Sequence, residues 1–399
     1  MERQKRHIFF VLLTLLLLIG SWAKAQQAGP NYELEARVHY GYMYFQHDKY
    51  HSALGRYSRH TPGYELSLHR NTYGEHRWEV LHNYPSIGLT FYYSGFGNDS
   101  ISAELGRVFA LYPFINFPLT PNEASKLTFK LGVGLSWLTN KFDPKENYHN
   151  YAIGSHLNAA VNLSFEYRQR IVDRLHWVSS IGLTHFSNGA TRSPNMGINI
   201  FSVSTGLSFY LATPKAHIDK RLRPRHYLFE FDGKRHFISD YQYTFGIKDM
   251  SQQYGTHQYF FVHNLAANFM FQLNERDRLG MGLELVYDFS DKVTKPDWDF
   301  YLKPGLLISY ETMLDRVSFM LNLGLRNNVP LNSKTFGLLF YQKVAIRYYF
   351  LDNWFATLAF TTYDIKADFI SVGVGYHIQH KYYLPQHAKK RYRSPIFPR

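Results

Sequence analysis

The chain has 399 residues, with 44 Lys or Arg against 31 Asp or Glu, so its formal net charge is +13. It contains no cysteine, which excludes disulfides, thiolate zinc sites and a cysteine nucleophile. Aromatic residues make up 18%, with 32 Tyr and 32 Phe, a content typical of membrane β-barrels with aromatic girdles at both membrane interfaces.

The first 25 residues are predicted to be a cleaved export signal. Arg3, Lys5 and Arg6 form a charged start, residues 8–19 form a short apolar core, and residues 23–25 (Ala-Lys-Ala) form a small-residue cleavage site. Cleavage there removes four basic residues and one acidic residue and leaves a net charge of about +10. No other stretch approaches eighteen uninterrupted apolar residues, so the sequence predicts no transmembrane helix.

Short alternating segments follow one another through the first half of the chain. The segment 126–138 is the clearest, because apolar residues such as Leu127 and Trp137 alternate with polar residues or glycine such as Lys130 and Gly134. Such alternation predicts strands with one face against lipid and one towards a polar interior. Eight strands are expected, at about 32–46, 62–72, 84–95, 100–118, 126–138, 155–171, 174–188 and 198–211.

The second half of the chain repeats this plan after a break in the alternation. Eight more strands are expected, near 225–249, 257–273, 277–288, 300–313, 315–327, 336–350, 353–364 and 367–379. We therefore predict an all-β, antiparallel outer-membrane barrel protein built as two tandem eight-stranded units, with one barrel of about sixteen strands as the alternative. A soluble sandwich is a further alternative.

The breaks in the pattern define the expected domains. These are a signal peptide (1–25), a first barrel (26–212), a basic linker (213–225), a second barrel (226–379) and a basic, proline-rich tail (380–399). The basic runs could attract phosphates of a membrane lipid. Nucleic acid is not an expected partner, because the chain is exported and its basic runs lack a base-stacking platform.

One hairpin combines residue type, spacing and face in a way that indicates chemistry. In the strand 179–188, His185 and Ser187 lie on the same face as Ile181 and Leu183. If the loop 188–197 turns near its centre, the antiparallel register places Asn199 opposite His185 on that apolar face.

These three residue types can form a nucleophilic site. A serine hydroxyl needs a base to take its proton, and that base needs a third group to fix its orientation. Three donors near the hydroxyl could stabilise an oxyanion, namely the side chains of Asn188 and Asn195 and the backbone N–H groups around Gly189. The alternative is a structural hydrogen-bonded pair, since His-x-Ser occurs readily by chance in a chain with this much His and Ser.

The same residues resemble two families of outer-membrane lipid hydrolases. The run 185–188 (His-Phe-Ser-Asn) with Pro194, Asn195 and Gly197 resembles the lipid A 3-O-deacylase (PagL) family, whose third triad member comes fourteen residues after the His. That position is Asn199 here, where the family pattern has Glu. The outer-membrane phospholipase A pattern, which it also resembles, does have Asn there. A looser resemblance extends to two-lobed proteins similar to acyloxyacyl hydrolases.

The resemblance implies Ser187 as nucleophile, His185 as base and Asn199 as the orienting residue. The expected function is that of an outer-membrane serine esterase acting on an acyl ester of lipid A. The alternatives are a phospholipase A, for which calcium is possible, and a non-catalytic structural or channel barrel. No cofactor is expected otherwise, and the sequence does not define an oligomeric state.

The last hairpin, 358–378, is the counterpart of this one in the second half. It has no His-x-Ser, and its turn is too short for a loop rich in Asn and Gly. We therefore expect the second unit to be non-catalytic. The charged residues Asp364, Lys366 and Asp368 beside that turn are interpreted as a solvated loop, with a metal or head-group contact as the alternative.

Overall fold

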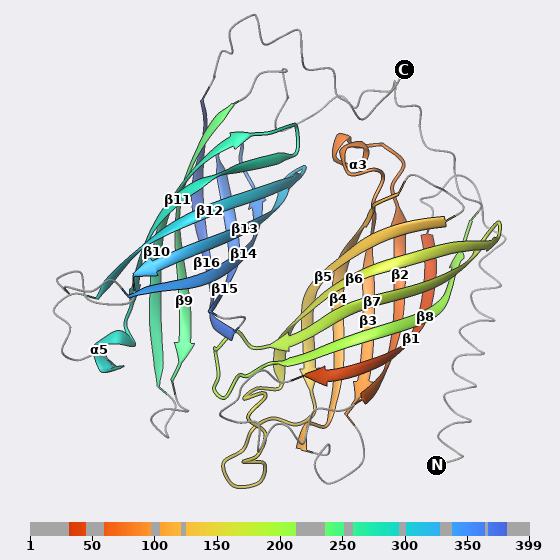
Figure 1. The fold of residues 1–399 in the computed structure, drawn as a ribbon, viewed down its shortest axis with the longest axis horizontal. Coiled ribbons are helices and arrows are strands. Elements are labelled where there is room, and N and C mark those ends of the chain that lie inside the picture. Colours follow the sequence, from red (N-terminus) through yellow and green to blue (C-terminus); the bar gives the residue numbers. More distant parts are fainter. Residues whose placement is uncertain are drawn as a thin grey trace, which may run out of the picture.

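The computed structural model describes residues 32–44, 60–96, 104–120, 125–212, 236–250, 258–294, 301–327, 337–363 and 366–380. They form two β-barrels, one from each half of the chain (Figure 1). The strands of the first are β1 (Tyr32–Tyr44), β2 (His60–Asn71), β3 (Ser86–Gly95), β4 (Arg107–Pro118), β5 (Ser125–Leu138), β6 (Leu157–Val172), β7 (Leu175–Ser187) and β8 (Ile198–Tyr210). Those of the second are β9 (Phe237–Asp249), β10 (Tyr259–Gln272), β11 (Asp277–Asp288), β12 (Leu302–Leu314), β13 (Val317–Asn327), β14 (Leu338–Tyr349), β15 (Trp354–Tyr363) and β16 (Lys366–His380).

Each barrel is an up-and-down meander that closes on itself. Consecutive strands pair antiparallel throughout, β1 also pairs with β8, and β9 also pairs with β16. The prediction of two tandem eight-stranded barrels is therefore confirmed. The alternatives of one barrel of about sixteen strands and of a soluble sandwich are wrong.

The strands turn apolar side chains outwards and polar ones inwards. In β1, Tyr40 is 65% exposed whereas Arg37 is 3% exposed. This arrangement is reversed relative to a water-soluble protein, and it suits a wall that faces lipid, where the closed ladder satisfies every backbone hydrogen bond. The fold is that of an outer-membrane β-barrel. No helix among the described residues is long and apolar enough to cross a membrane.

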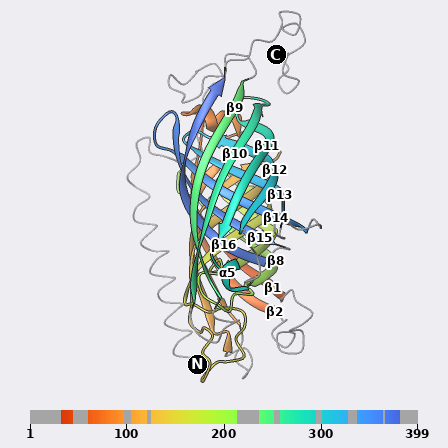
Figure 2. The same ribbon diagram turned by 90° about the vertical axis from the view of Figure 1, so that its left-hand side faces the viewer.

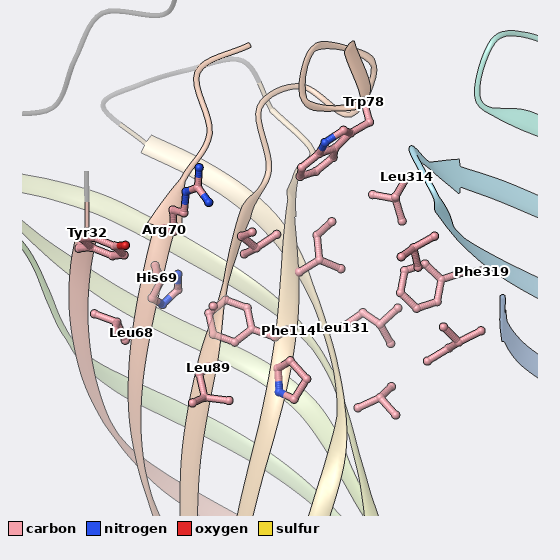
Figure 3. A pocket seen from close by; sticks show the side chains of 17 residues that line it. Tyr32, Leu68, His69, Arg70, Trp78, Leu89, Phe114, Leu131, Leu314 and Phe319 are labelled. Carbon is pink, nitrogen blue, oxygen red and sulfur yellow. The ribbon is translucent and has the colours of Figure 1, made fainter. Parts of the chain in front are cut away.

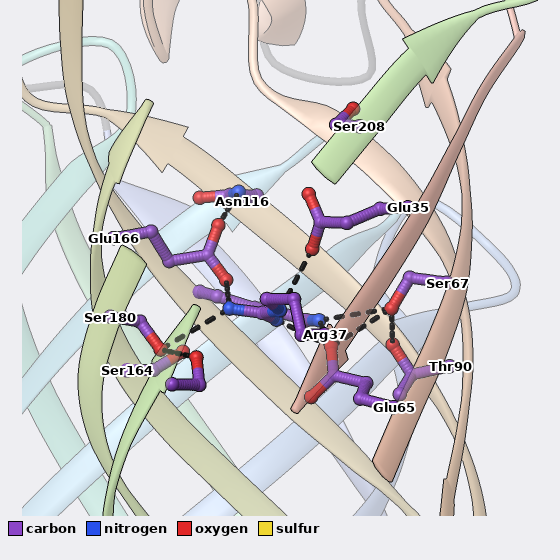
Figure 4. A network of polar contacts seen from close by, with 12 residues as sticks. Glu35, Arg37, Glu65, Ser67, Thr90, Asn116, Ser164, Glu166, Ser180 and Ser208 are labelled. Carbon is purple, nitrogen blue, oxygen red and sulfur yellow. Dashed lines mark hydrogen bonds and ion pairs between the residues drawn. The ribbon is translucent and has the colours of Figure 1, made fainter. Parts of the chain in front are cut away.

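Charged side chains fill the interior of the first barrel (Figure 4). The guanidinium of Arg37 contacts Glu35 at 2.9 Å and Glu166 at 2.8 Å, and it also pairs with Glu65. Lys130 lies 2.6 Å from the same Glu65. Buried charges of opposite sign therefore compensate one another across the interior.

The second barrel has an equivalent interior. Glu284 pairs with both Arg326 and Lys343, and Arg347 lies 2.6 Å from Asp240. An eight-stranded barrel is just wide enough for side chains to fill, and these networks occupy both interiors. The packed interiors disfavour the channel alternative.

The two barrels contact each other near the turns that follow β2, β10 and β12, which we call the turn end. The short helix α3 (Arg77–Leu81) follows β2, and its Arg77 pairs with Glu275 of the second barrel. His82 donates from Nε2 to the carbonyl oxygen of Met313 at 2.9 Å. Figure 2 shows the second barrel in front of the first, with these turns at one end of both.

An apolar crevice of about 660 Å³ lies between the barrel walls at the turn end. Leu89 and Leu131 line it from the first barrel, and Leu314 and Phe319 line it from the second (Figure 3). Trp78 of α3 lies at its edge. At this end the barrels thus meet through polar contacts between turns and leave an apolar space between their walls.

Several predicted segments lie outside the described residues. They are the signal peptide (1–25), the linker (213–225), Asp364 and the tail beyond His380. Asp368, from the charged cluster beside the last turn, is described. It lies in β16 and pairs with Lys248, so the prediction that it belongs to a solvated loop is wrong.

Candidate active site

The hairpin formed by β7 and β8 places the predicted residues on the outer wall of the first barrel. His185 pairs directly with Asn199 in the antiparallel register, as the sequence predicted. Their face is the lipid-facing one, because Ile181 and Phe201 on it are 61% and 52% exposed. This part of the hairpin lies at the end opposite the turn end, which we call the loop end.

The imidazole of His185 is oriented by Asn199. Its Nδ1 lies 2.7 Å from Oδ1 of Asn199. Because an amide oxygen only accepts, Nδ1 carries the hydrogen, and Nε2 is left with a lone pair. The neutral histidine is therefore in the tautomer that a general base requires.

Ser187 ends β7 and is only 2% exposed, under the loop 188–197. Its Oγ accepts hydrogen bonds from the backbone N–H of Gly189 at 3.1 Å and from Nδ2 of Asn195 at 2.9 Å. The backbone N–H of Asn188 donates to Oδ1 of Asn195 at 3.1 Å. Oδ1 of Asn195 also lies 3.2 Å from Oγ of Ser187, from which it can accept, so both ends of the amide are within hydrogen-bond distance of the serine.

The side chain of Asn188 has a different position from the one expected of an oxyanion donor. Its Nδ2 donates to Oγ of Ser155 at 3.0 Å and to the carbonyl oxygen of Arg192 at 2.8 Å. Both amide hydrogens are thus used to hold the loop. Of the three predicted donors, Gly189 and Asn195 are the two whose N–H groups point at the serine oxygen.

A tight turn presents Gly189 to the serine. Gly189 and Ala190 have φ of +63° and +61°, and the N–H of Thr191 donates to the carbonyl oxygen of Asn188 at 3.3 Å. Two consecutive left-handed residues are the signature of a type I′ turn. Glycine adopts this conformation freely, but alanine does so at a cost.

Gly197, at the other end of the loop, lies against the imidazole. Its φ is +74°, and a Cβ added to it would lie 2.8 Å from Cε1 of His185. Its N–H donates to the carbonyl oxygen of Ala152, in the loop between β5 and β6, at 3.0 Å. The close approach to the ring requires glycine at this position.

An apolar groove of about 630 Å³ runs across the outer wall beside the site. Leu183 and Phe201 line it, and they are the nearest residue pair to His185 and Asn199 on the same face of the hairpin. Other apolar residues that line it are Tyr40, Leu163, Phe165, Ile181 and Val203.

The structure brings all six predicted residues to one end of the hairpin: Ser187, His185, Asn199, Asn188, Gly189 and Asn195. Among the described residues, no hydrogen bond joins His185 to Ser187. Sequence reasoning did not identify Ser155 or Ala152 as supports of the site. Gly197 was part of the recognised motif, but its contact with the imidazole was not foreseen.

Within the part of the chain that the structure describes, no three His, Asp or Glu side chains are grouped so that they could hold a metal ion. A hydroxyl, an imidazole and an amide can act together in acyl transfer without a metal.

Comparison with known proteins gives matches to solved structures and to protein families. Solved structures with some similarity include the outer membrane enzyme PagL, at 15% identity over 43% of this chain and 97% of that chain, with a TM-score of 0.32. Neisserial surface protein A matches at 8% identity over 45% and 96%, with a TM-score of 0.31. OccK5 of Pseudomonas aeruginosa matches at 10% over 88% and 98%, with a TM-score of 0.21. No curated protein sequence matches the chain.

Two family descriptions match separate parts of the sequence. Residues 62–208 match lipid A 3-O-deacylase (PagL), and residues 238–381 match the C-terminal domain of acyloxyacyl hydrolase. The first match includes His185, Ser187 and Asn199, and the second includes nearly all of the second barrel.

Proposed function

Because the chain belongs to the lipid A deacylase and acyloxyacyl hydrolase family of ester hydrolases, we propose that it is an outer-membrane serine esterase that removes an acyl chain from lipid A. The observation that carries this proposal is the His185–Asn199 hydrogen bond on the lipid-facing wall, two residues from Ser187. Polar side chains on a lipid-facing wall cost free energy unless they form hydrogen bonds, either with each other or with a substrate.

In the proposed reaction, Nε2 of His185 takes the proton of Ser187 as Oγ attacks the ester carbonyl. Asn199 accepts the hydrogen bond from Nδ1 and keeps the ring in place as it becomes positively charged. The tetrahedral intermediate collapses, and His185 returns the proton to the departing sugar alkoxide. Water then attacks the acyl-enzyme by the same route and releases the fatty acid.

Gly189 and Asn195 are the proposed donors to the oxyanion. Their N–H groups converge on Oγ of Ser187 in the resting structure. Once Oγ has bonded to the carbonyl carbon, the carbonyl oxygen lies close enough to take over these hydrogen bonds.

The resting site has to rearrange before it reacts. Ser187 is buried by the loop and bonded to Asn195 rather than to His185. Residues two apart on a strand are about 6.5 Å apart at Cα, a gap that an imidazole can bridge once the serine rotates towards it. Catalytic hydrogen bonds often form only when the substrate is bound.

The groove explains how a membrane lipid could reach the site. An acyl chain that stays in the groove and the bilayer avoids transfer to water, which costs about 0.8 kcal/mol per CH₂. The substrate would approach by lateral diffusion along the barrel wall.

The test is mass spectrometry of lipid A after incubation with the purified protein in vesicles. Wild type should release one fatty acid and leave lipid A lighter by one acyl chain, and the folded Ser187→Ala variant should leave lipid A unchanged. Identical lipid A spectra for wild type, Ser187→Ala and protein-free vesicles would contradict the proposal.

Asn at position 199 favours one second candidate, a phospholipase A with the same catalytic residues. Phospholipid vesicles, with calcium or with a chelator, provide the comparison. Faster release of fatty acid from phospholipid than from lipid A, dependent on calcium, would support this second function over the first.

A further inference from the structure

The loop that covers Ser187 is bonded to the second barrel. The N–H of Ser193 donates to Oδ2 of Asp249 at 2.9 Å, and its Oγ donates to the carbonyl oxygen of Asp249 at 2.7 Å. The N–H of Asp249 donates to the carbonyl oxygen of Ala190 at 2.8 Å. Three hydrogen bonds therefore join one residue of the second barrel to the loop of the first.

Asp249 and a second residue that contacts the loop, Ile370, both lie on paired β-strands of the second barrel. Asp249 is the last residue of β9, is 2% exposed and pairs with Tyr259 of β10. Ile370 lies on the neighbouring strand β16, where it pairs with Ile247 of β9. On the side of the second barrel, the loop is thus held by β-strands.

Ile370 contacts the turn at Gly189. A Cβ added to Gly189 would lie only 2.2 Å from Cγ1 of Ile370. The turn therefore lies directly on this side chain, and any larger residue at position 189 would have to move away from the second barrel. The N–H of the same Gly189 donates to Oγ of Ser187.

The turn needs outside support because of Ala190. A left-handed conformation costs an alanine about 1–2 kcal/mol, and such residues persist where their surroundings hold them. The carbonyl oxygen of Ala190 is one of the groups bonded to Asp249. The second barrel thus stabilises the strained residue next to the proposed oxyanion donor.

We propose that the second barrel positions the active site of the first, with Asp249 and Ile370 holding the turn so that the Gly189 N–H stays aimed at the reacting carbonyl oxygen. This inference rests on the proposed function. Asp249 and Ile370 are positioning residues, since they act through the loop and touch neither the serine nor the imidazole. The second barrel is then a part of the catalytic apparatus.

The experiment measures kcat and KM of the full chain in detergent micelles with a chromogenic acyl ester. Asp249→Ala removes the Oδ2 acceptor of the Ser193 N–H and leaves the two backbone hydrogen bonds of residue 249 in place. It should lower kcat about tenfold, because a less firmly held donor stabilises the transition state less, and should leave KM within about twofold. Asp249→Asn keeps an acceptor for Ser193 and should retain most of the activity. Adding Ala190→Gly to Asp249→Ala should recover part of kcat, since glycine holds the turn unaided.

Glu275→Ala is the matched control, because it removes a contact between the barrels at the turn end. It should leave kcat unchanged. Amide hydrogen exchange of residues 188–193 should rise in Asp249→Ala and not in Glu275→Ala, while the β-strands of both variants stay protected.

The outcomes separate this inference from the proposed function. Wild type without esterase activity would defeat both. An active wild type with equal kcat in Asp249→Ala, or an equal loss of kcat in Glu275→Ala, would overturn the inference alone. If Asp249→Ala does not fold, a normal kcat in Ser193→Ala combined with Ile370→Ala would do the same.

Discussion

The last hairpins of the two barrels have the same place in the fold and different side chains. On the outer face near the loop end, β7 and β8 carry the pair His185 and Asn199, whereas β15 and β16 carry Phe360 and Ile370. The equivalent position of the second barrel's last hairpin thus holds an entirely apolar pair. The fold therefore does not require the polar pair in the first barrel.

The connections differ as well. The first hairpin is joined by the ten-residue segment 188–197, which brings Gly189 and Asn195 to the serine, whereas the second is joined across 364–365. The second hairpin supplies Ile370, which lies against Gly189. One hairpin thus carries the proposed chemistry, and its counterpart carries a support for it.

The largest expected effect is the loss of esterase activity when a proposed catalytic residue of the first hairpin is replaced, because the second hairpin has no such residues. Ser187→Ala and His185→Ala should each lower esterase activity at least about 10⁴-fold, and the double variant should be no worse, because the two residues act as a unit. Thr362→Ala, near the end of β15, is the control and should have normal kinetics. Additive losses in the double variant would show that Ser187 and His185 act separately.

Both barrels have buried charge networks in their interiors. Variants of these networks are therefore expected to change the free energy of unfolding and not the catalytic reaction. Arg347→Met leaves Asp240 and Glu311 without their shared cation and should lower the free energy of unfolding by about 3–5 kcal/mol. Urea unfolding in micelles measures this. The exposed Arg170→Met should change stability by less than about 0.5 kcal/mol. Equal effects of the two variants would show that the network contributes nothing.

Asn199 tests how the imidazole is oriented. Asn199→Ala should lower kcat about 100-fold, because His185 loses the acceptor that fixes its tautomer. Asn199→Glu, which restores the residue of the family pattern, should keep substantial activity. An active Asn199→Ala together with an inactive Asn199→Glu would contradict the role given to this hydrogen bond.

Gly197 tests the fit of the loop against the ring. Gly197→Ala should lower kcat about tenfold, because its Cβ would displace the imidazole from the position required for proton transfer. Gly95→Ala is a suitable control, since the nearest atom to its added Cβ is 3.5 Å away. Normal activity in both variants would mean that the ring tolerates the shift.

The smallest effect concerns the contact at the turn end. Burial lowers the pKa of His82 below its usual 6.5. The unfolded chain therefore binds more protons than the folded one just below pH 6.5, so stability should fall as the pH drops from 6.5 towards the lower folded pKa. Urea midpoints between pH 7 and 5 measure this dependence, and it should weaken in His82→Gln. A dependence unchanged in that variant would assign it to other groups.

Much of the fold follows from the sequence because alternation is a local signal. The segment 277–288 is found as Asp277–Asp288. The predicted strand 100–118 begins only at Arg107, because Gly106 has φ of +71° and Leu105 packs into the apolar core. The described residues 104–106 thus belong to a turn and not to the strand, a difference that a two-residue period does not reveal.

Part of the candidate site could also be predicted from the sequence, and part could not. The pairing of His185 with Asn199 could be predicted, because a hairpin register follows from the position of its loop. The contacts of Asp249 and Ile370 with the loop could not be predicted, because no local sequence pattern indicates which surfaces of two barrels contact each other.

Labelling with a fluorophosphonate, followed by peptide mapping, tests most directly the claim that Ser187 is an activated nucleophile. We predict one adduct, on Ser187, which is absent in Ser187→Ala, forms slowly in His185→Ala, and has no counterpart on serines of the second barrel. An unlabelled folded wild type, or an adduct on another serine that persists in Ser187→Ala, would contradict the account.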